Sequence, residues 1–197
     1  MSAEEDLAEI ELDLPAGGNR FALIAAAVAG VILLSFIAIL ATSEPDTGLG
    51  PSPLIAQPAP PILGETIDGS TFDITAHRGR WVVVNFFSTT CIPCIEEHPE
   101  LVSFQETHEP TGRATIVSVS FSDRASNVEE FFETFGGGWP VLAQDVGRYA
   151  IEYGVSAVPE TYLVAPSGIV TTKFLGGITQ ADLETEMARL EGTSVAS

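Results

Sequence analysis

The sequence predicts an α/β fold with a mixed central sheet, preceded by one transmembrane helix. Two observations lead to this expectation: a long apolar run near the N-terminus, and strand and helix patterns that first alternate and then finish in a strand pair and a helix. A length of 197 residues suits one ordinary domain plus an extra segment. With 8 basic and 27 acidic side chains, the net charge of −19 argues against a nucleic-acid partner.

The apolar run at 21–41 predicts a membrane anchor. Nineteen of its 21 residues are apolar and none is charged. At about 1.5 Å per residue it spans roughly 31 Å, which is close to the ~30 Å hydrocarbon core of a bilayer. A cleaved signal peptide is the alternative, with a weak cleavage site at Ala41-Thr42-Ser43, but the run exceeds a signal h-region and follows an acidic segment. Arg20 favours a cytoplasmic N-terminus, so we expect a single-pass cell-membrane protein with an extracytoplasmic domain.

Composition separates the other segments. We interpret 1–20 as an acidic cytoplasmic tail and 42–61, which has six prolines, as an extended linker between anchor and domain. The remaining stretch, 62–197, carries 19 acids and 7 bases and can bury a core without disulfide staples.

Within that domain, a short hairpin is expected over 62–74, turning at Asp68-Gly69. The uniformly apolar run 81–87 predicts a central strand that is covered on both faces. The other expected elements are strands at 114–121, 141–143, 161–164 and 169–174, and helices at 92–108, 127–135, 146–153 and 181–190. This order predicts a mixed sheet flanked by helices.

Both cysteines lie in Cys91-Ile92-Pro93-Cys94, just after the predicted strand 81–87 and at the start of the next helix. A two-residue gap lets two thiols reach disulfide geometry with little backbone change. The unpaired N–H groups and dipole of a helix start favour a thiolate at Cys91. Pro93 falls in the first turn, where its missing N–H is harmless. This context favours a redox-active dithiol.

Other roles for the cysteines fit less well. A disulfide that closes so short a loop adds little stability. A c-type haem site needs histidine where Ile95 stands, and a peroxiredoxin-type peroxidase needs proline where Val84 stands. A non-catalytic metal-binding module using Cys91, Cys94 and His98 remains an alternative, although no fourth ligand is evident. The dithiol interpretation itself requires no metal and no other cofactor.

The stretch VVVNFFSTTCIPCIEEHPEL, followed downstream by GVSAVPETYLV, resembles the membrane-anchored thioredoxin-like proteins of the TlpA/ResA/CcmG (DsbE) type. The resemblance covers roughly 58–192 and implies a thioredoxin-like fold and thiol-disulfide oxidoreductase activity. Pro99 matches the proline of the active-site helix. Val158-Pro159 matches the cis-proline loop, which in that fold faces the dithiol and can pair with a substrate strand.

The same resemblance assigns roles to two acids. Glu97, three residues after the second cysteine, matches an acid implied to tune thiol protonation, although taken alone it would be a solvated helix glutamate. Glu160 matches the Pro-Glu-Thr of cytochrome-maturation members, and with Val158 and Pro93 it is expected to bind substrate. Asn85 stands where ordinary thioredoxins carry a buried aspartate, which leaves Glu97 as the expected general base.

Thr90 departs from the family pattern, which usually places tryptophan before the first cysteine, and Phe86-Phe87 replaces the common Phe-Trp. By resemblance, the substrates are cysteine pairs of apocytochromes c during cytochrome c biogenesis, and a transmembrane thiol-reducing partner recharges the domain. The alternative within redox chemistry is a general thiol oxidase or reductase that acts on other exported proteins.

Overall fold

The computed structural model describes residues 20–42, 48–144 and 146–194, and the chain forms two compact units, Met1–Pro45 and Asp46–Ser197. The first unit holds helix α1 (Arg20–Thr42). Among the residues described, none of the helices combines the length and apolarity that a bilayer crossing requires, so the anchor at 21–41 stays a prediction. The tail expected over 1–20 lies, apart from Arg20, outside the described residues.

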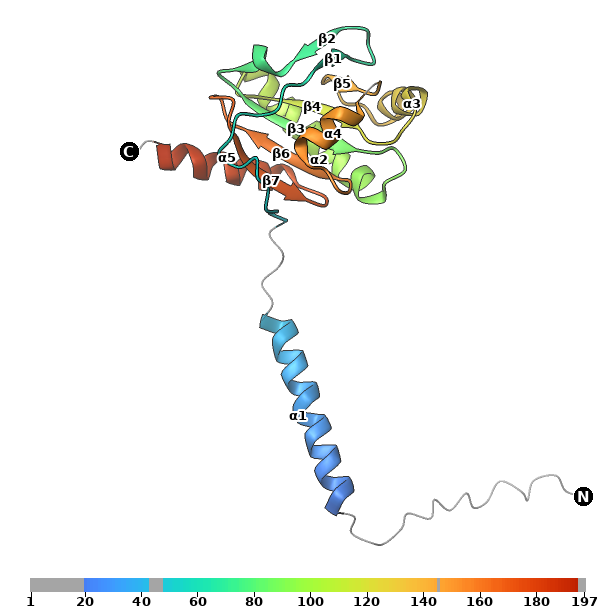
Figure 1. Ribbon diagram of the computed structural model, residues 1–197, viewed down its shortest axis with the longest axis vertical. Helices are drawn as coiled ribbons and strands as arrows, with labels where there is room; N and C mark the ends of the chain where they lie inside the picture. Colours follow the sequence, from blue (N-terminus) through green and yellow to red (C-terminus); the bar gives the residue numbers. More distant parts are fainter. Residues whose placement is uncertain (1–19, 43–47, 145, 195–197) are drawn as a thin grey trace, which may run out of the picture. The chain divides into compact units, whose positions relative to one another are not determined.

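The second unit is built on a five-stranded mixed sheet with the order β5-β4-β3-β6-β7 (Figure 1). Its central strand β3 pairs in parallel with β4 and antiparallel with β6, and β6 pairs antiparallel with β7. The strand bounds are β3 (Trp81–Phe87), β4 (Ala114–Ser120), β5 (Val141–Leu142), β6 (Glu160–Val164) and β7 (Val170–Leu175). The mixed sheet predicted from the element order is confirmed.

Helices and a hairpin cover the two faces of this sheet (Figure 1). The core on one face includes side chains from α2 (Ile92–His108), α3 (Ala125–Phe135) and α5 (Gln180–Ser194). The other face packs against α4 (Gly147–Tyr153) and the antiparallel hairpin of β1 (Leu63–Glu65) and β2 (Thr71–Asp73). Two short 3₁₀ helices, Ile74–His77 and Glu109–Thr111, complete the fold.

Side-chain alternation along β3 decides which residues face α2. Val83 and Phe87 belong to the core on the α2 and α5 side, whereas Val84 and Phe86 belong to the core on the α4 side. Successive side chains of a strand point to opposite faces, so Asn85 lies on the α2 side. The residue that interrupts an otherwise apolar strand is thereby placed under the helix that carries the cysteines.

The bounds predicted for β3 and α2 are confirmed residue for residue, and the hairpin turns at the predicted Asp68-Gly69. The other elements differ by one or two residues at most ends, and α5 continues to Ser194, four residues beyond the expected end. Leu183 and Met187 of α5 are fully buried.

The segment expected to be an extended linker, 42–61, pairs with the edge of the sheet at 48–50 and 56–59. Leu49 bridges Phe174 and Pro58 bridges Ile169, while the N–H of Gly50 donates to the carbonyl of Lys173 at 2.8 Å. The outer edge of β7 would otherwise expose unpaired N–H and C=O groups, and an extended segment supplies their partners. The described part of the linker therefore belongs to the domain, and residues 43–47 lie outside the description.

Candidate functional site

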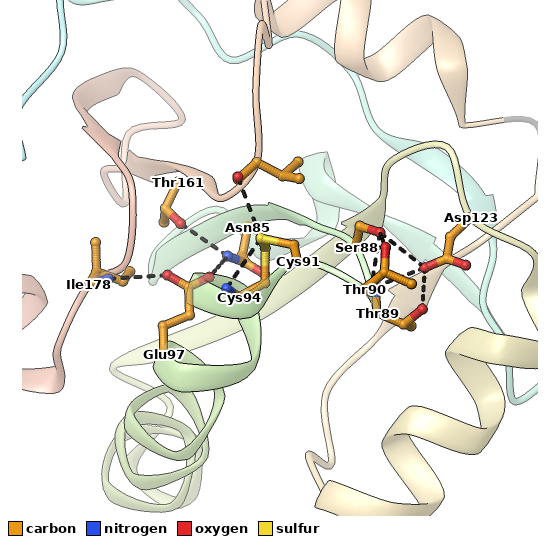
Figure 2. Close-up of a disulfide and its surroundings, with 11 residues drawn as sticks. Asn85, Ser88, Thr89, Thr90, Cys91, Cys94, Glu97, Asp123, Thr161 and Ile178 are labelled. Carbon is orange, nitrogen blue, oxygen red and sulfur yellow. Dashed lines mark hydrogen bonds between the residues drawn. A yellow bond between two sulfur atoms is a disulfide. The ribbon is translucent and has the colours of Figure 1, made fainter.

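The two cysteines lie where the central strand passes into helix α2. They form a disulfide with a Cα–Cα distance of 5.2 Å (Figure 2). Cys91 has extended backbone geometry and is the N-cap of α2: its Sγ accepts the N–H of Cys94 at 3.3 Å. Pro93 lies in the first turn and is exposed, so its missing N–H leaves no partner unsatisfied.

Burial distinguishes the two sulfur-bearing residues. Cys94 is 3% exposed and belongs to the core, whereas Cys91 is half-buried and only packs against it. An N-cap sulfur that receives a helix N–H is placed to be stabilised as a thiolate once the disulfide is reduced. The geometry therefore presents Cys91 to an incoming disulfide and keeps Cys94 behind it.

Glu97 lies one turn after Cys94 on the same side of α2 and is 3% exposed. Its Oε1 accepts a hydrogen bond from Asn85 Nδ2 at 2.8 Å, and its Oε2 accepts the N–H of Ile178 at 3.1 Å (Figure 2). Burial raises the pKa of Glu97 to about 7, and these two hydrogen bonds oppose part of that rise. An acid with a pKa near neutrality can both accept and release a proton at physiological pH.

The Val158–Pro159 loop faces the dithiol. The carbonyl oxygen of Val158 lies 3.5 Å from Cys91 Sγ, and the peptide bond between Val158 and Pro159 is cis. Pro159 itself is buried, so the loop offers its backbone at Val158 to the surroundings of the sulfur. Of the residues expected to bind substrate, Val158 and Pro93 thus lie near Cys91.

Glu160 differs from the expectation that it contacts substrate. It pairs with Phe86 across β3 and β6 and, by alternation, faces the α4 side of the sheet, opposite to Thr161 and Glu97. It is 1% exposed and its Oε2 forms a 2.9 Å ion pair with the Nζ of the buried Lys173. A side chain enclosed in this way cannot reach a bound protein.

The Glu160 side chain instead stabilises the loop that leads to Val158–Pro159. Its Oε1 accepts hydrogen bonds from the N–H and hydroxyl of Ser156, at 3.2 and 2.9 Å. Burial works against ionisation, but the hydrogen bonds from Lys173 and Ser156 outweigh it and hold the pKa of Glu160 below its usual range. Within the pair, the pKa of Lys173 rises despite its burial because of Glu160 and Tyr162.

Asp123 is a site residue that the sequence analysis did not single out. It lies between β4 and α3, and its Oδ2 accepts the N–H and the hydroxyl of Thr89, at 2.8 and 2.6 Å (Figure 2). Burial disfavours its ionisation, but the hydrogen bonds from Thr89 and Arg124 prevail and lower the pKa of the carboxyl. The sequence did carry one signal for this role. Asp123 comes just after β4, and the carboxyl end of β4 lies next to the carboxyl end of β3.

His98 does not join the cysteines. Its Nε2 lies 2.9 Å from the carbonyl oxygen of Gly136, and its ring packs against Phe131 and Trp139. Burial lowers the pKa of His98. In the part of the chain that the structure describes, no group of three or more His, Cys, Asp or Glu side chains is arranged to hold a metal ion.

Comparisons with known proteins agree with this geometry. The AhpC/TSA family matches residues 55–173. CycY of Rhizobium leguminosarum bv. viciae, a thiol:disulfide interchange protein, is 33% identical over 110 residues, which span 55% of this chain and 57% of CycY. The thiol-disulfide oxidoreductase ResA of Bacillus subtilis (strain 168) is 30% identical over 124 residues, 62% of this chain and 68% of ResA.

A solved structure shares both the fold and a measurable part of the sequence. The crystal structure of a thiol:disulfide interchange protein of the thioredoxin family from Chlorobium tepidum TLS superimposes with a TM-score of 0.62 and 27% identity. The match covers 67% of this chain and 94% of that one. The thioredoxin-like architecture inferred from the motifs is thus confirmed, with the cysteine pair at the start of α2.

Proposed function

The chain belongs to the AhpC/TSA family, with the TlpA/ResA/CcmG thiol-disulfide oxidoreductases as its relatives, and from this premise we propose that it reduces cysteine pairs of apocytochromes c. The observation that carries the proposal is the unequal burial of Cys91 and Cys94 at the N-terminus of α2. The oxidoreductase activity follows from the relatives, and the choice of apocytochrome c follows from the resemblance of the motifs.

The reduced protein would act in two exchange steps. The Cys91 thiolate attacks one sulfur of the substrate disulfide, so a new S–S bond forms while the substrate bond breaks and one substrate thiolate leaves. Cys94 then loses its proton to Glu97 and attacks Cys91 Sγ, which releases the second substrate thiolate. Two electrons pass to the substrate, the Cys91–Cys94 disulfide remains, and Glu97 returns its proton to water or to a departing thiolate.

The substrate would approach over the exposed residues around Cys91. Thr90 and Ile92 flank the cysteine and are exposed, and the backbone of Val158 lies beside its sulfur. With Thr90 in place of an indole, the entrance to the sulfur is open on that side. An extended peptide could therefore pair with the Val158 backbone while its own disulfide meets Cys91.

The position in the cell is part of the same proposal. We place the domain outside the cytoplasm, attached to the membrane by residues 21–41, with protein disulfides as substrates and a transmembrane thiol-reducing protein as the electron donor. Support comes from the apolar run and from Arg20. The electron donor is required by the stoichiometry, because each turnover leaves the dithiol oxidised.

Trapping of the mixed disulfide tests the assignment of the two cysteines. Cys94→Ser should accumulate a covalent adduct with an oxidised CxxCH peptide, whereas Cys91→Ser should form none. Full reductase turnover by Cys91→Ser would overturn the assignment. A matched peptide ending in CxxCA tests the substrate: equal adduct formation with both peptides would favour a general reductase over one for apocytochromes c.

Redox titration of the full-length chain tests the direction of electron flow. A midpoint well below about −200 mV supports a reductase, and one near −120 mV supports an oxidase of exported proteins. A metal-binding module would instead take up a thiophilic ion such as zinc stoichiometrically when reduced. His98 Nε2 lies within hydrogen-bond distance of the carbonyl oxygen of Gly136, and its ring packs against Phe131. It is therefore not placed to bind a metal ion together with the cysteines, which speaks against such a module.

A further inference from the structure

A chain of hydrogen bonds crosses the buried side of the sheet and ends on Glu97. The indole Nε1 of Trp139 donates to Ser118 Oγ at 2.9 Å, and Ser118 Oγ donates to Asn85 Oδ1 at 3.2 Å. Asn85 Nδ2 then donates to Glu97 Oε1 at 2.8 Å. All four side chains are at most 5% exposed, so water does not compete for these partners.

The chemistry of the groups fixes the direction of the chain. An indole N–H can only donate, so the Ser118 oxygen must accept and its own hydrogen is directed to another acceptor. That acceptor is Asn85 Oδ1, and a carboxamide whose oxygen faces Ser118 must turn its NH₂ toward the other side. There it meets Glu97 Oε1 and, at 3.1 Å, the hydroxyl oxygen of Thr161.

We propose that Trp139 and Ser118 are positioning residues that keep the amide of Asn85 turned toward Glu97 and thereby set the proton affinity of that acid. The inference rests on the proposed role of Glu97 as the proton acceptor of Cys94. Without the donor at Trp139, Ser118 can donate elsewhere and Asn85 can rotate. A rotated amide would bring its carbonyl against the carboxylate, which favours the protonated acid.

The fold leaves room for this indole. Trp139 packs against the rings of Phe132 and His98, at 5.5 and 5.3 Å between centroids. A Cβ at Gly137 would lie 2.9 Å from the Trp139 ring, and Gly137 also has a φ of +110°, so glycine is required there on both grounds. The glycine segment 136–138 therefore lets the indole N–H of Trp139 reach Ser118 of β4.

The titration of Glu97 can be isolated from its neighbours. The groups that face it are Asn85 from β3, Thr161 from β6 and the N–H of Ile178 before α5, and none of these titrates near neutral pH. Around α2 the two cysteines do not titrate in the disulfide, and the other titratable groups of the helix, Glu96, His98, Glu100, Glu106 and His108, are unchanged in Glu97→Gln, so they cancel in a difference between the two proteins. Measurement on the oxidised protein therefore reports the carboxyl.

The test is an infrared pH titration of the oxidised full-length chain, in which Glu97→Gln identifies the band of the protonated Glu97 carboxyl. Trp139→Phe should raise the midpoint of that band by about half to one unit, since one hydrogen bond is worth about a unit of pKa or less. Trp81→Phe is the matched control: it is a second buried indole in the same core, and it loses a 2.9 Å bond to Glu191 instead.

Ser118→Ala interrupts the chain at its middle with a smaller change of volume and should shift the midpoint in the same direction, so a misfolded Trp139→Phe does not remove the test. The proposal would be overturned if the variants that fold shift the midpoint no more than Trp81→Phe does. It would also be overturned if either of them lowers the midpoint. The measurement uses no substrate, so a failure of the apocytochrome proposal would leave it standing. If the wild type shows no Glu97 band that titrates near pH 7, the result would count against Glu97 as the proton acceptor and also against the proposed effect of the hydrogen-bond chain.

Discussion

Asp123 lies on the connection between β4 and α3, yet its Oδ2 accepts the backbone N–H of Thr89 at 2.8 Å, two residues before Cys91. The same oxygen accepts the Thr89 hydroxyl at 2.6 Å, while Oδ1 accepts the N–H of Arg124. The carboxylate therefore ties the turn before the active-site helix to the next connection along the sheet. This turn closes with the N–H of Cys91 on the carbonyl of Ser88 at 3.2 Å.

Asp123→Ala should slow the alkylation of reduced Cys91 at pH 7 about fivefold, which corresponds to the ~1 kcal/mol value of a helix cap. A loosened turn no longer holds Cys91 as the N-cap of α2, so its thiolate loses stabilisation. Asp73→Ala is the control, because Asp73 accepts the same pair of bonds from Thr75, at 2.8 and 2.7 Å, next to the core on the α4 side of the sheet. Faster alkylation of Asp123→Ala, as loss of a nearby negative charge alone would produce, would contradict this account.

Glu97 should make the stability of the oxidised protein fall as the pH rises. Its pKa in the folded state is about 7, against 4.5 for an ordinary glutamate, so the folded protein binds more protons between these values. The contribution of Glu97 to the free energy of unfolding is then greatest below about pH 4.5. It is lost as the pH rises through 7, by on the order of 3 kcal/mol relative to Glu97→Gln. Chemical unfolding of both proteins at pH 5 and pH 8 measures the difference. Parallel pH dependences would show that Glu97 ionises normally.

Lys173→Met should lower the free energy of unfolding by about 3 kcal/mol, because it leaves the buried carboxylate of Glu160 without its ion-pair partner. Adding Glu160→Gln should recover most of this loss. The control is Arg80→Met, which breaks the partly exposed pair with Glu109 and should cost less than about 1 kcal/mol. Equal losses for the two methionine variants would mean that the Glu160 pair is as weak as a surface pair.

The segment 48–61 should resist hydrogen exchange like the edge of a sheet. The amides of Gly50, Ala56 and Ala59 donate to carbonyls of Lys173, Val170 and Gly168 at 2.8 to 2.9 Å. We expect these three amides to exchange at least about tenfold more slowly than in an unstructured peptide, since each opening breaks a bond to β7 or to the turn that precedes it. Exchange as fast as in an unstructured peptide would show that the segment does not pair with the sheet, and would favour the extended linker predicted from its prolines.

Local sequence patterns were sufficient for much of the fold. The apolar run of β3 and the cysteine-proline start of α2 predicted both elements residue for residue, because burial on two faces and a helix N-terminus each leave a pattern within a few residues. The cysteine motif also predicted the chemistry. Its two sulfurs are neighbours in sequence, so no long-range contact was needed to bring them together.

Contacts between distant segments could not be predicted in the same way. The prolines of 48–61 indicated an extended segment, whereas the chain turns over 53–56, and whether such a segment is solvated or paired depends on an open sheet edge more than 100 residues away. Glu160 was expected near substrate because it follows Pro159. The pleat of β6 turned it to the opposite face, where Lys173 neutralises it.

The sequence by itself determined the dithiol, its place at a helix start and the acid one turn later, because these depend on spacing along one helix. Only the tertiary structure decided how Glu97 is buried, which amide faces it and that Asp123 holds the turn before Cys91. Those relationships join β3, β4 and the loop before α5, and proton affinity depends on the surroundings that such packing creates.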